Sequence, residues 1–167
     1  PVERAIRRFE KRFTGARCER QPMHTVYGGG HLFTADTIGK LSKLALKSFD
    51  ERAPDALALS RIFGISDSIA SQVHDRIRSQ IERAAIEDYR IDFEDGFGPR
   101  SETDEDAEAR RTASEVLKAA GEGLLPPYIG IRVRSFNSAT LVRARRTLDI
   151  FFDTLTDVAP PIVVTLP

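Results

Sequence analysis

The sequence predicts an α/β fold built on a parallel sheet. From Tyr89 onward, strand and helix patterns alternate with repeats of roughly 35 to 40 residues, the spacing of right-handed βα units. An earlier strand pattern at residues 21–27 brings the count to four βα steps, half of an eight-stranded barrel. A doubly wound open sheet competes, but no glycine-rich dinucleotide fingerprint follows these strands. We therefore expect residues 1–167 to form one domain, the first four βα units of a TIM-type (β/α)8 barrel.

The first part of the chain is predicted to hold a helix, a strand and a second helix. Residues 2–13 place apolar side chains on one helical face and Arg or Lys on the other, which indicates an outer amphipathic helix within residues 1–15. After the strand at 21–27, a helix is expected to open near Thr34, with Thr34 as N-cap and Asp36 in the first turn. Its predicted buried face consists of Ile38, Leu41, Leu44, Ala45 and Phe49.

A helical insertion is predicted at residues 51–65. Pro54 interrupts the preceding helix, and residues 56–63 form a short helix that Gly64 ends. Ser66 is then expected to cap a long helix on which His74 faces solvent. The apolar side of that helix repeats every four residues, at Ile69, Val73, Ile77 and Ile81.

Two further helices and two strands are predicted in the second half. Residues 101–106 combine Ser and Thr with acidic side chains, which is typical of a helix start, and Gly121 and Gly123 mark its end. A strand follows at residues 128–133, and Ser138 is expected to cap the next helix. Pro160 and Pro161 then end the connection into the final strand, in residues 161–167. The predicted buried residues of the two helices are Ala113, Val116, Leu117 and Ala120, then Leu141, Leu148, Phe151, Phe152 and Leu155.

Composition excludes several classes of protein. The 25 basic and 25 acidic residues balance, so nothing suggests nucleic acid or an anionic membrane as a partner. No apolar run approaches the roughly 18 residues of a membrane helix. The single cysteine, Cys18, cannot form an internal disulfide and has no clear basic neighbour, so we expect it to be inert. We expect a cytoplasmic protein and, because the last strand needs neighbours on both sides, a piece of a longer chain.

The stretch at residues 89–98 is the main candidate for a functional site. It has the pattern of a buried strand that ends in Asp92, Glu94 and Asp95, followed by two glycines. Because burying unpaired carboxylates costs several kcal/mol, a cation, an Arg or backbone donors should face them. One interpretation is a magnesium-type site or its surroundings, since hard cations prefer carboxylate oxygens. The other is a helix N-cap with an ion pair to Arg.

Arg132 lies within an otherwise apolar strand, so we expect its guanidinium to point into the barrel mouth. It could pair with Asp92 or Glu94, or bind a carboxylate or phosphate of a substrate through two hydrogen bonds. Arg134 is expected on the same face, nearer the rim.

His24 and Tyr27 are predicted to stand at the mouth of the first strand, where the following helix N-terminus could bind an anion. The glycines at residues 28–30 are better explained by the bend they must make, whereas for His24 a role in the site and a structural role are equally favoured. His31 is expected to be a loop residue.

Three motifs carry a family resemblance: Asp-Phe-Glu-Asp-Gly at residues 92–96, Gly-Ile-Arg-Val at 130–133 and Val-Val-Thr-Leu-Pro at 163–167. In this order the sequence resembles the HpcH/HpaI aldolase and citrate lyase β-subunit superfamily, across about residues 23–167. That superfamily has Asp-Leu-Glu-Asp on one barrel strand, Arg on the next and Leu-Pro-Lys on the one after. The chain differs in having Val26-Tyr27-Gly28 where relatives commonly have Phe-Val-Pro.

The resemblance implies a phosphoenolpyruvate/pyruvate-type barrel and a lyase that makes or breaks a carbon–carbon bond next to an enolate. The substrate would be a 2-keto acid or an acyl thioester, with coenzyme A as a potential carrier and Mg²⁺ or Mn²⁺ as cofactor. Arg132, Asp92 and Glu94 would be catalytic, with Asp95 lining the substrate pocket. The direct metal ligands of relatives come from later strands, which this chain lacks.

Related barrels assemble from several copies, so the resemblance also implies a homo-oligomer. Two other functions stay open from the sequence. The chain could be a non-catalytic half-barrel that pairs its sheet edges with a partner. It could also be a phosphoenolpyruvate-utilising or mutase-like enzyme on the same barrel.

Overall fold

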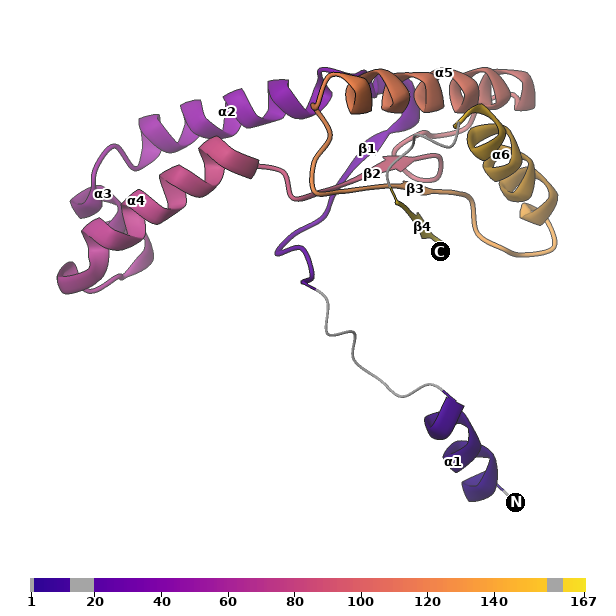
Figure 1. The fold of residues 1–167 in the computed structure, drawn as a ribbon, viewed down its shortest axis with the longest axis horizontal. Helices are drawn as coiled ribbons and strands as arrows, with labels where there is room; N and C mark the ends of the chain where they lie inside the picture. Colours follow the sequence, from indigo (N-terminus) through magenta and orange to yellow (C-terminus); the bar gives the residue numbers. More distant parts are fainter. Residues whose placement is uncertain (1, 13–19, 156–160) are drawn as a thin grey trace.

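The computed structural model describes residues 2–12, 20–155 and 161–167, and it has an α/β fold (Figure 1). Cys18 and residues 13–15 of the predicted first helix lie outside these ranges. In chain order the elements are α1 (Val2–Arg12), β1 (Val26–Gly29), a short 3-10 helix (Gly30–Leu32), α2 (Thr37–Arg52), α3 (Ala56–Phe63), α4 (Asp67–Ala84), β2 (Asp88–Asp92), α5 (Glu102–Gly121), β3 (Tyr128–Arg132), α6 (Leu141–Thr154) and β4 (Ile162–Thr165).

The four strands form one sheet in which every neighbouring pair is parallel and the order is β1-β2-β3-β4. Each strand therefore lies beside the one that precedes it in the chain. The register aligns Gly29 with Asp92, Asp92 with Arg132 and Arg132 with Thr165, so the last residues of all four strands meet at one edge. The predicted α/β fold with a parallel sheet is confirmed.

The hydrophobic core lies between one face of the sheet and the helices α5 and α6. Small residues on the helices allow a close approach to large side chains on the strands and their ends. The fully buried members include Ile91, Phe93, Ile129, Ile131 and Val133 from the strand regions, and Ala109, Ala113, Val116, Ala144 and Phe151 from the helices. Since side chains alternate along a strand, the residues between these apolar ones face the other side of the sheet.

The other face of the sheet is polar. Arg90 pairs with the fully buried carboxylate of Asp88, which also accepts a hydrogen bond from the Thr25 hydroxyl at 2.8 Å. Gly130 makes room for Arg90, because a Cβ there would lie 3.0 Å from the Arg90 side chain. The sheet thus has one apolar face and one face of paired charges.

The first strand begins later than the predicted residues 21–27. Residues 20–23 bind Glu87 instead of extending the strand. The Met23 N–H donates to the Glu87 carboxylate at 2.8 Å, and Arg20 pairs with the same carboxylate at 2.7 Å. The pairing of β1 with β2 begins at Val26, which lies opposite Tyr89, so residues 21–25 precede the strand. His24 consequently precedes the strand.

Two helices begin two residues later than predicted, with N-cap positions at Asp36 and Thr140, because a turn with its own side-chain hydrogen bonds precedes each. Thr34 is not the N-cap of α2; its hydroxyl donates to Asp36 at 2.6 Å, and the helix starts at Thr37. Ser138 does not cap α6, which starts at Leu141. There the Asn137 side-chain oxygen accepts from two following backbone amides.

The predicted signals at four other helix ends are confirmed, at Ser101, Gly121, Gly64 and Ser66, and Asp55 is a cap that the sequence did not predict. Ser101 caps α5 by accepting a hydrogen bond from the Asp104 amide at 3.1 Å, and the helix ends at Gly121. Asp55 caps α3, and Gly64 ends it in the left-handed conformation with φ of 65°. Ser66 is the N-cap position of α4, although its hydroxyl bonds to Ser68 rather than to the helix backbone.

Helices α2, α3 and α4 form an arm that extends away from the sheet (Figure 1). Residues predicted to be buried are exposed there, including Leu44 and Ile69, because the arm packs mainly on itself. His74 does not face solvent as predicted. Its ring lies 5.0 Å from that of Phe49, and a ring nitrogen is 3.0 Å from the Ala53 carbonyl oxygen.

The inward face of α6 also differs from the prediction. Leu141 and Phe152 are exposed, whereas Ala144, Thr147 and Phe151 are buried against α5 and the sheet. At the N-terminus, α1 forms as expected, with Ile6 and Phe9 exposed. Within the described residues, no helix is both long enough and apolar enough to cross a bilayer.

Candidate functional site

The guanidinium of Arg132 contacts the carboxylate of Asp92, which ends β2, and the two carboxylates that follow it, Glu94 and Asp95. It binds Asp92 through two hydrogen bonds, from Nε to Oδ1 at 2.8 Å and from Nη2 to Oδ2 at 2.5 Å. Nη2 is 3.2 Å from Oδ2 of Asp95, and Nη1 is 3.5 Å from Oε2 of Glu94. Asp92 and Arg132 meet because they are directly paired in the parallel register of β2 and β3. We call these four residues the Arg132 cluster.

Asp92 is the buried anchor of the Arg132 cluster. Besides Arg132, its carboxylate accepts hydrogen bonds from the backbone amides of Glu94 and Gly96, each at 2.8 Å. Burial would raise the pKa of Asp92, but the hydrogen bonds from Arg132 and the two amides outweigh it and hold the pKa below its ordinary value. Asp92 therefore stays ionised and fixes the orientation of the guanidinium, whose pKa the same contact raises.

Glu94 and Asp95 form the open side of the Arg132 cluster. One oxygen of Glu94 accepts a hydrogen bond from the Ser135 hydroxyl at 2.8 Å, while Asp95 is 83% exposed in its side chain. With three carboxylates and one guanidinium, the four residues carry a net charge of −2. Such an excess is tolerable because water reaches this side, and it favours a cation as a neighbour.

Tyr27 covers the guanidinium from β1. Its ring centroid lies 4.8 Å from the central carbon of Arg132, within the range of a cation–π contact. The side chain of Arg132 keeps 19% exposure beneath this ring. The sequence placed Tyr27 at the mouth of the first strand but did not predict its contact with Arg132, and a role in substrate binding stays a prediction.

Two glycines allow the end of β1 to approach the acidic loop. A Cβ on Gly29 would lie 2.2 Å from the Gly96 carbonyl oxygen, and one on Gly96 would lie 2.7 Å from Oδ2 of Asp92. Any larger residue would push the loop away from the strand. From the sequence, the glycines at 28–30 were explained by the bend, Gly96 was noted only as a glycine after the acidic residues, and Ser135 was missed. The packing of Gly29 against Gly96 and the contact of Ser135 with Glu94 were therefore not predicted. The signal available was the position of Gly96 and Ser135 directly after strand ends.

His24 is wrongly placed by the sequence analysis. It lies before β1, at the opposite end of the sheet from the Arg132 cluster, where it lines a mostly apolar cavity with Met23 and residues of α4. His31 follows the carboxyl end of β1 instead, with its ring 5.7 Å from that of Phe97. Its Nδ1 is buried and has no hydrogen-bond partner among the described residues.

Arg134 does not share the face of Arg132. Beyond the end of β3 the chain turns, and the Arg134 Nε donates to Glu105 of α5 at 3.0 Å. The expected position on the same face near the rim is therefore wrong, because the strand pattern ends at Arg132.

The Arg132 cluster does not make a complete metal site. Asp92 accepts four hydrogen bonds, which occupies the usual acceptor positions of a carboxylate and leaves Glu94 and Asp95 as oxygen donors. Across residues 2–12, 20–155 and 161–167, no group of three or more His, Cys, Asp or Glu side chains could hold a metal ion. What the cluster offers by itself is a rigidly held guanidinium at an open edge.

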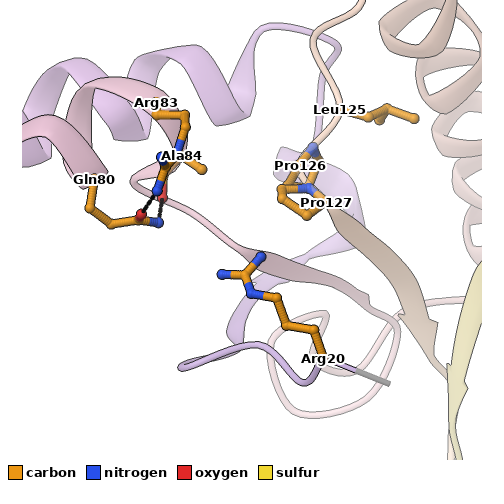
Figure 2. Close-up of a pocket in the computed structure, with 7 residues that line it drawn as sticks. All are labelled: Arg20, Gln80, Arg83, Ala84, Leu125, Pro126 and Pro127. Atoms are coloured by element: carbon orange, nitrogen blue, oxygen red, sulfur yellow. Dashed lines mark hydrogen bonds between the residues drawn. The ribbon is translucent and has the colours of Figure 1, made fainter. Parts of the chain in front are cut away.

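Another cavity lies at the opposite end of the sheet. Figure 2 shows Arg20 across from the last turn of α4, where Gln80 bonds to Arg83 and to the Ala84 carbonyl oxygen, with Pro126 and Pro127 on the far wall. Its volume is about 620 Å³. In parallel α/β proteins, sites form at the carboxyl ends of strands, so we assign no chemistry to this cavity.

Comparison with known families gives one match. A family model described as a domain of unknown function (DUF6986) matches residues 2–167. Searches of curated proteins and of solved structures found no match.

Proposed function

The chain belongs to the DUF6986 family of domains of unknown function, and from the Arg132 cluster we propose that it forms part of the active site of a carbon–carbon lyase of aldolase type. In this proposal the sheet is the first half of a (β/α)8 barrel. The order β1-β2-β3-β4 supports that reading, because barrel strands follow one another in sequence. The substrate would be a small 2-keto acid or an acyl thioester.

One observation carries the proposal: a guanidinium is held in one orientation at the carboxyl edge of a parallel sheet. Cleavage next to a carbonyl group develops negative charge on an enolate oxygen. A donor that is already oriented stabilises that charge without reorganising during the reaction. Arg132 would be the catalytic residue that contacts this oxygen, with Asp92 as its positioning residue.

The charge of the Arg132 cluster bears on how a substrate would bind. A keto acid is an anion, and a cluster with a net charge of −2 repels it unless a cation is present. This is why we retain Mg²⁺ or Mn²⁺ as the expected cofactor, although the described residues do not hold it by themselves. Glu94 and Asp95 are the side chains that could border such an ion, and Tyr27 would limit access to Arg132.

The test is turnover by the full-length protein. Retro-aldol cleavage of 4-hydroxy-2-keto acids and of 3-hydroxyacyl thioesters is measured with Mg²⁺, for the wild type and for Arg132→Lys. The lysine keeps a positive charge near Asp92 but loses the two-pronged geometry. We expect kcat/KM to fall by about 10²- to 10³-fold, the usual cost of losing one oriented donor.

The matched control is Arg145→Lys on α6, whose exposed side chain pairs with Asp149 at 3.5 Å, away from the Arg132 cluster. It should leave kcat/KM unchanged. Equal turnover of Arg132→Lys and the wild type would remove Arg132 from the reaction, and no cleavage of either substrate class by the wild type would contradict the lyase proposal.

A second candidate function is binding of a partner through the sheet edge. The observation that favours it is β4, an edge strand among the described residues, on which Val163 and Val164 are exposed, with Leu166 exposed just beyond. Placing Lys at Val164 should weaken a partner contact without changing the fold. Unchanged sedimentation of the full-length protein carrying Val164→Lys would count against it. A mutase-like enzyme would use the Arg132 cluster as well, and the lyase assay separates the two by product.

A further inference from the structure

A cavity lined by four arginines lies between the amino-terminal ends of α5 and α6. Its volume is about 350 Å³, and its wall includes Arg100, Arg134, Arg143 and Arg146, together with the carboxylate of Glu102. We call it the arginine cavity. None of the four residues of the Arg132 cluster belongs to its wall.

The positive charges around the arginine cavity are only partly compensated. Arg134 and Arg143 share a single oxygen of Glu105, at 3.0 and 2.6 Å. Arg146 has its own carboxylate, because its Nη2 lies 2.5 Å from Asp106. Two guanidinium groups bound to one carboxylate have a net charge of +1. Clusters of guanidinium groups with an excess of positive charge are suited to bind an anion.

Arg100 adds a charge that neutral groups hold in place. Its Nε donates to the Phe97 carbonyl oxygen at 3.1 Å, and its central carbon lies 4.9 Å from the centre of the Phe97 ring. The four arginines, set against Glu102, Glu105 and Asp106, give a net charge of +1 (four minus three).

Two polar groups at the start of α6, the Arg143 side chain and the Thr140 hydroxyl, also bear on whether the arginine cavity binds a ligand. The Nε of Arg143 is buried and has no hydrogen-bond partner among the described residues. Buried donors are nearly always paired, so this one calls for a ligand or a water. Thr140, the N-cap of α6, donates its hydroxyl to the Ser135 carbonyl oxygen and does not cap the helix with its side chain.

We propose that the arginine cavity binds the dianionic phosphate group of a small ligand. A guanidinium matches phosphate oxygens in pairs, and several of them around one cavity are typical of phosphate recognition. The volume is at the low end for ligand pockets, which suits a phosphate group better than a whole larger molecule. The proposal is independent of any reaction at Arg132.

The experiment is calorimetric titration of the full chain at low ionic strength with inorganic phosphate and with methyl phosphate. We expect saturable binding with a dissociation constant below about 10 mM, which corresponds to a weak affinity. Arg100→Ala and Arg146→Ala should each weaken binding about 10-fold or more, since each removes a charge-assisted contact. Arg134 and Arg143 are not substituted, because both support Glu105.

The two probes distinguish the sources of the phosphate. Equal affinity for both indicates a phosphate that can carry a substituent, and binding of inorganic phosphate alone indicates the free anion. The matched control is Arg145→Ala, whose side chain is 79% exposed and pairs with Asp149 instead of lining the cavity. It should bind like the wild type.

Three results would overturn the proposal. One is the absence of saturable binding by the wild type. Another is an equal loss of binding in Arg145→Ala and Arg146→Ala, which would show attraction to overall charge only. The third is unchanged affinity in both Arg100→Ala and Arg146→Ala while their circular dichroism spectra match the wild type.

Discussion

Two charged clusters follow neighbouring strands, and they combine the same groups in opposite proportions. In the Arg132 cluster one guanidinium contacts three carboxylates. The second, which we call the Glu105 cluster, has one carboxylate bound by Arg134 and Arg143, and by the Thr147 hydroxyl at 2.7 Å. Arg132 and Arg134 are only two residues apart, yet one serves each cluster.

Burial separates the roles of these two clusters. Glu105 is 1% exposed and joins the end of β3 to both α5 and α6, so it acts as a structural link. The Arg132 cluster has Asp95 in solvent and keeps carboxylate oxygens open. A charge in a low-dielectric interior must be paired, whereas an excess of one sign persists only where water or a ligand reaches it. The two clusters therefore differ in whether water reaches their carboxylates, and this exposure, rather than the number of charges, locates the candidate site.

The largest expected effect tests the structural role of the Glu105 cluster. Glu105→Ala would leave two guanidinium groups without their shared carboxylate, so the free energy of unfolding should fall by about 3–5 kcal/mol. Urea denaturation followed by circular dichroism measures it. Asp149→Asn, which breaks only an exposed pair with Arg145, is the control and should cost less than about 1 kcal/mol. Similar losses in the two variants would end the distinction between the clusters.

A smaller effect is expected in the open cluster. Arg132→Met removes two of the four hydrogen bonds of Asp92, but the two backbone amides remain and water can enter. We expect a loss of about 1–3 kcal/mol in the free energy of unfolding. The double variant Arg132→Met with Asp92→Asn should lose less than the sum of the single variants, because the two side chains interact directly. Strict additivity would mean that Asp92 does not depend on Arg132.

The meeting of Asp92 with Arg132 could be predicted because it follows from local signals. The apolar side chains at residues 89, 91 and 93 and within residues 129–133 defined β2 and β3, and parallel neighbours bring the ends of consecutive strands together. The cap at Ser101 and the stop at Gly121 are likewise encoded within a few residues of each helix end.

Other features depend on contacts that no short pattern contains. His24 was misplaced because Arg20 and the Met23 amide bind the carboxylate of Glu87, so that β1 starts only at Val26. Arg134 was misplaced because the chain turns after β3 towards Glu105. The periodic side chains Leu44 and Ile69 marked an apolar helix face correctly, but periodicity does not say whether anything covers that face.

The smallest expected effect is a dependence of stability on pH, in which Asp92 is compared with Asp106, the residue after Glu105 that pairs with Arg146. Both carboxyl groups have lowered pKa values, Asp106 chiefly through its hydrogen bond with Arg146 and Asp92 through Arg132 and backbone amides that outweigh burial. A lowered folded-state pKa gives stability that is complete above the unfolded value of about 3.9 and is lost as pH falls through the folded value. Between about pH 5 and pH 2 the wild type should therefore become less stable.

Asp92→Asn should flatten this loss of stability more than Asp106→Asn does. Asp92 is almost completely buried, whereas the Arg146 partner of Asp106 is largely in solvent and its attraction is screened. Urea denaturation at about pH 5, 4 and 3 gives the slopes. Added salt should reduce the contribution of Asp106 and leave that of Asp92 nearly unchanged. An Asp92→Asn slope equal to that of the wild type would show that the pKa of Asp92 does not change on folding, and would contradict its role as the buried, ionised anchor of the Arg132 cluster.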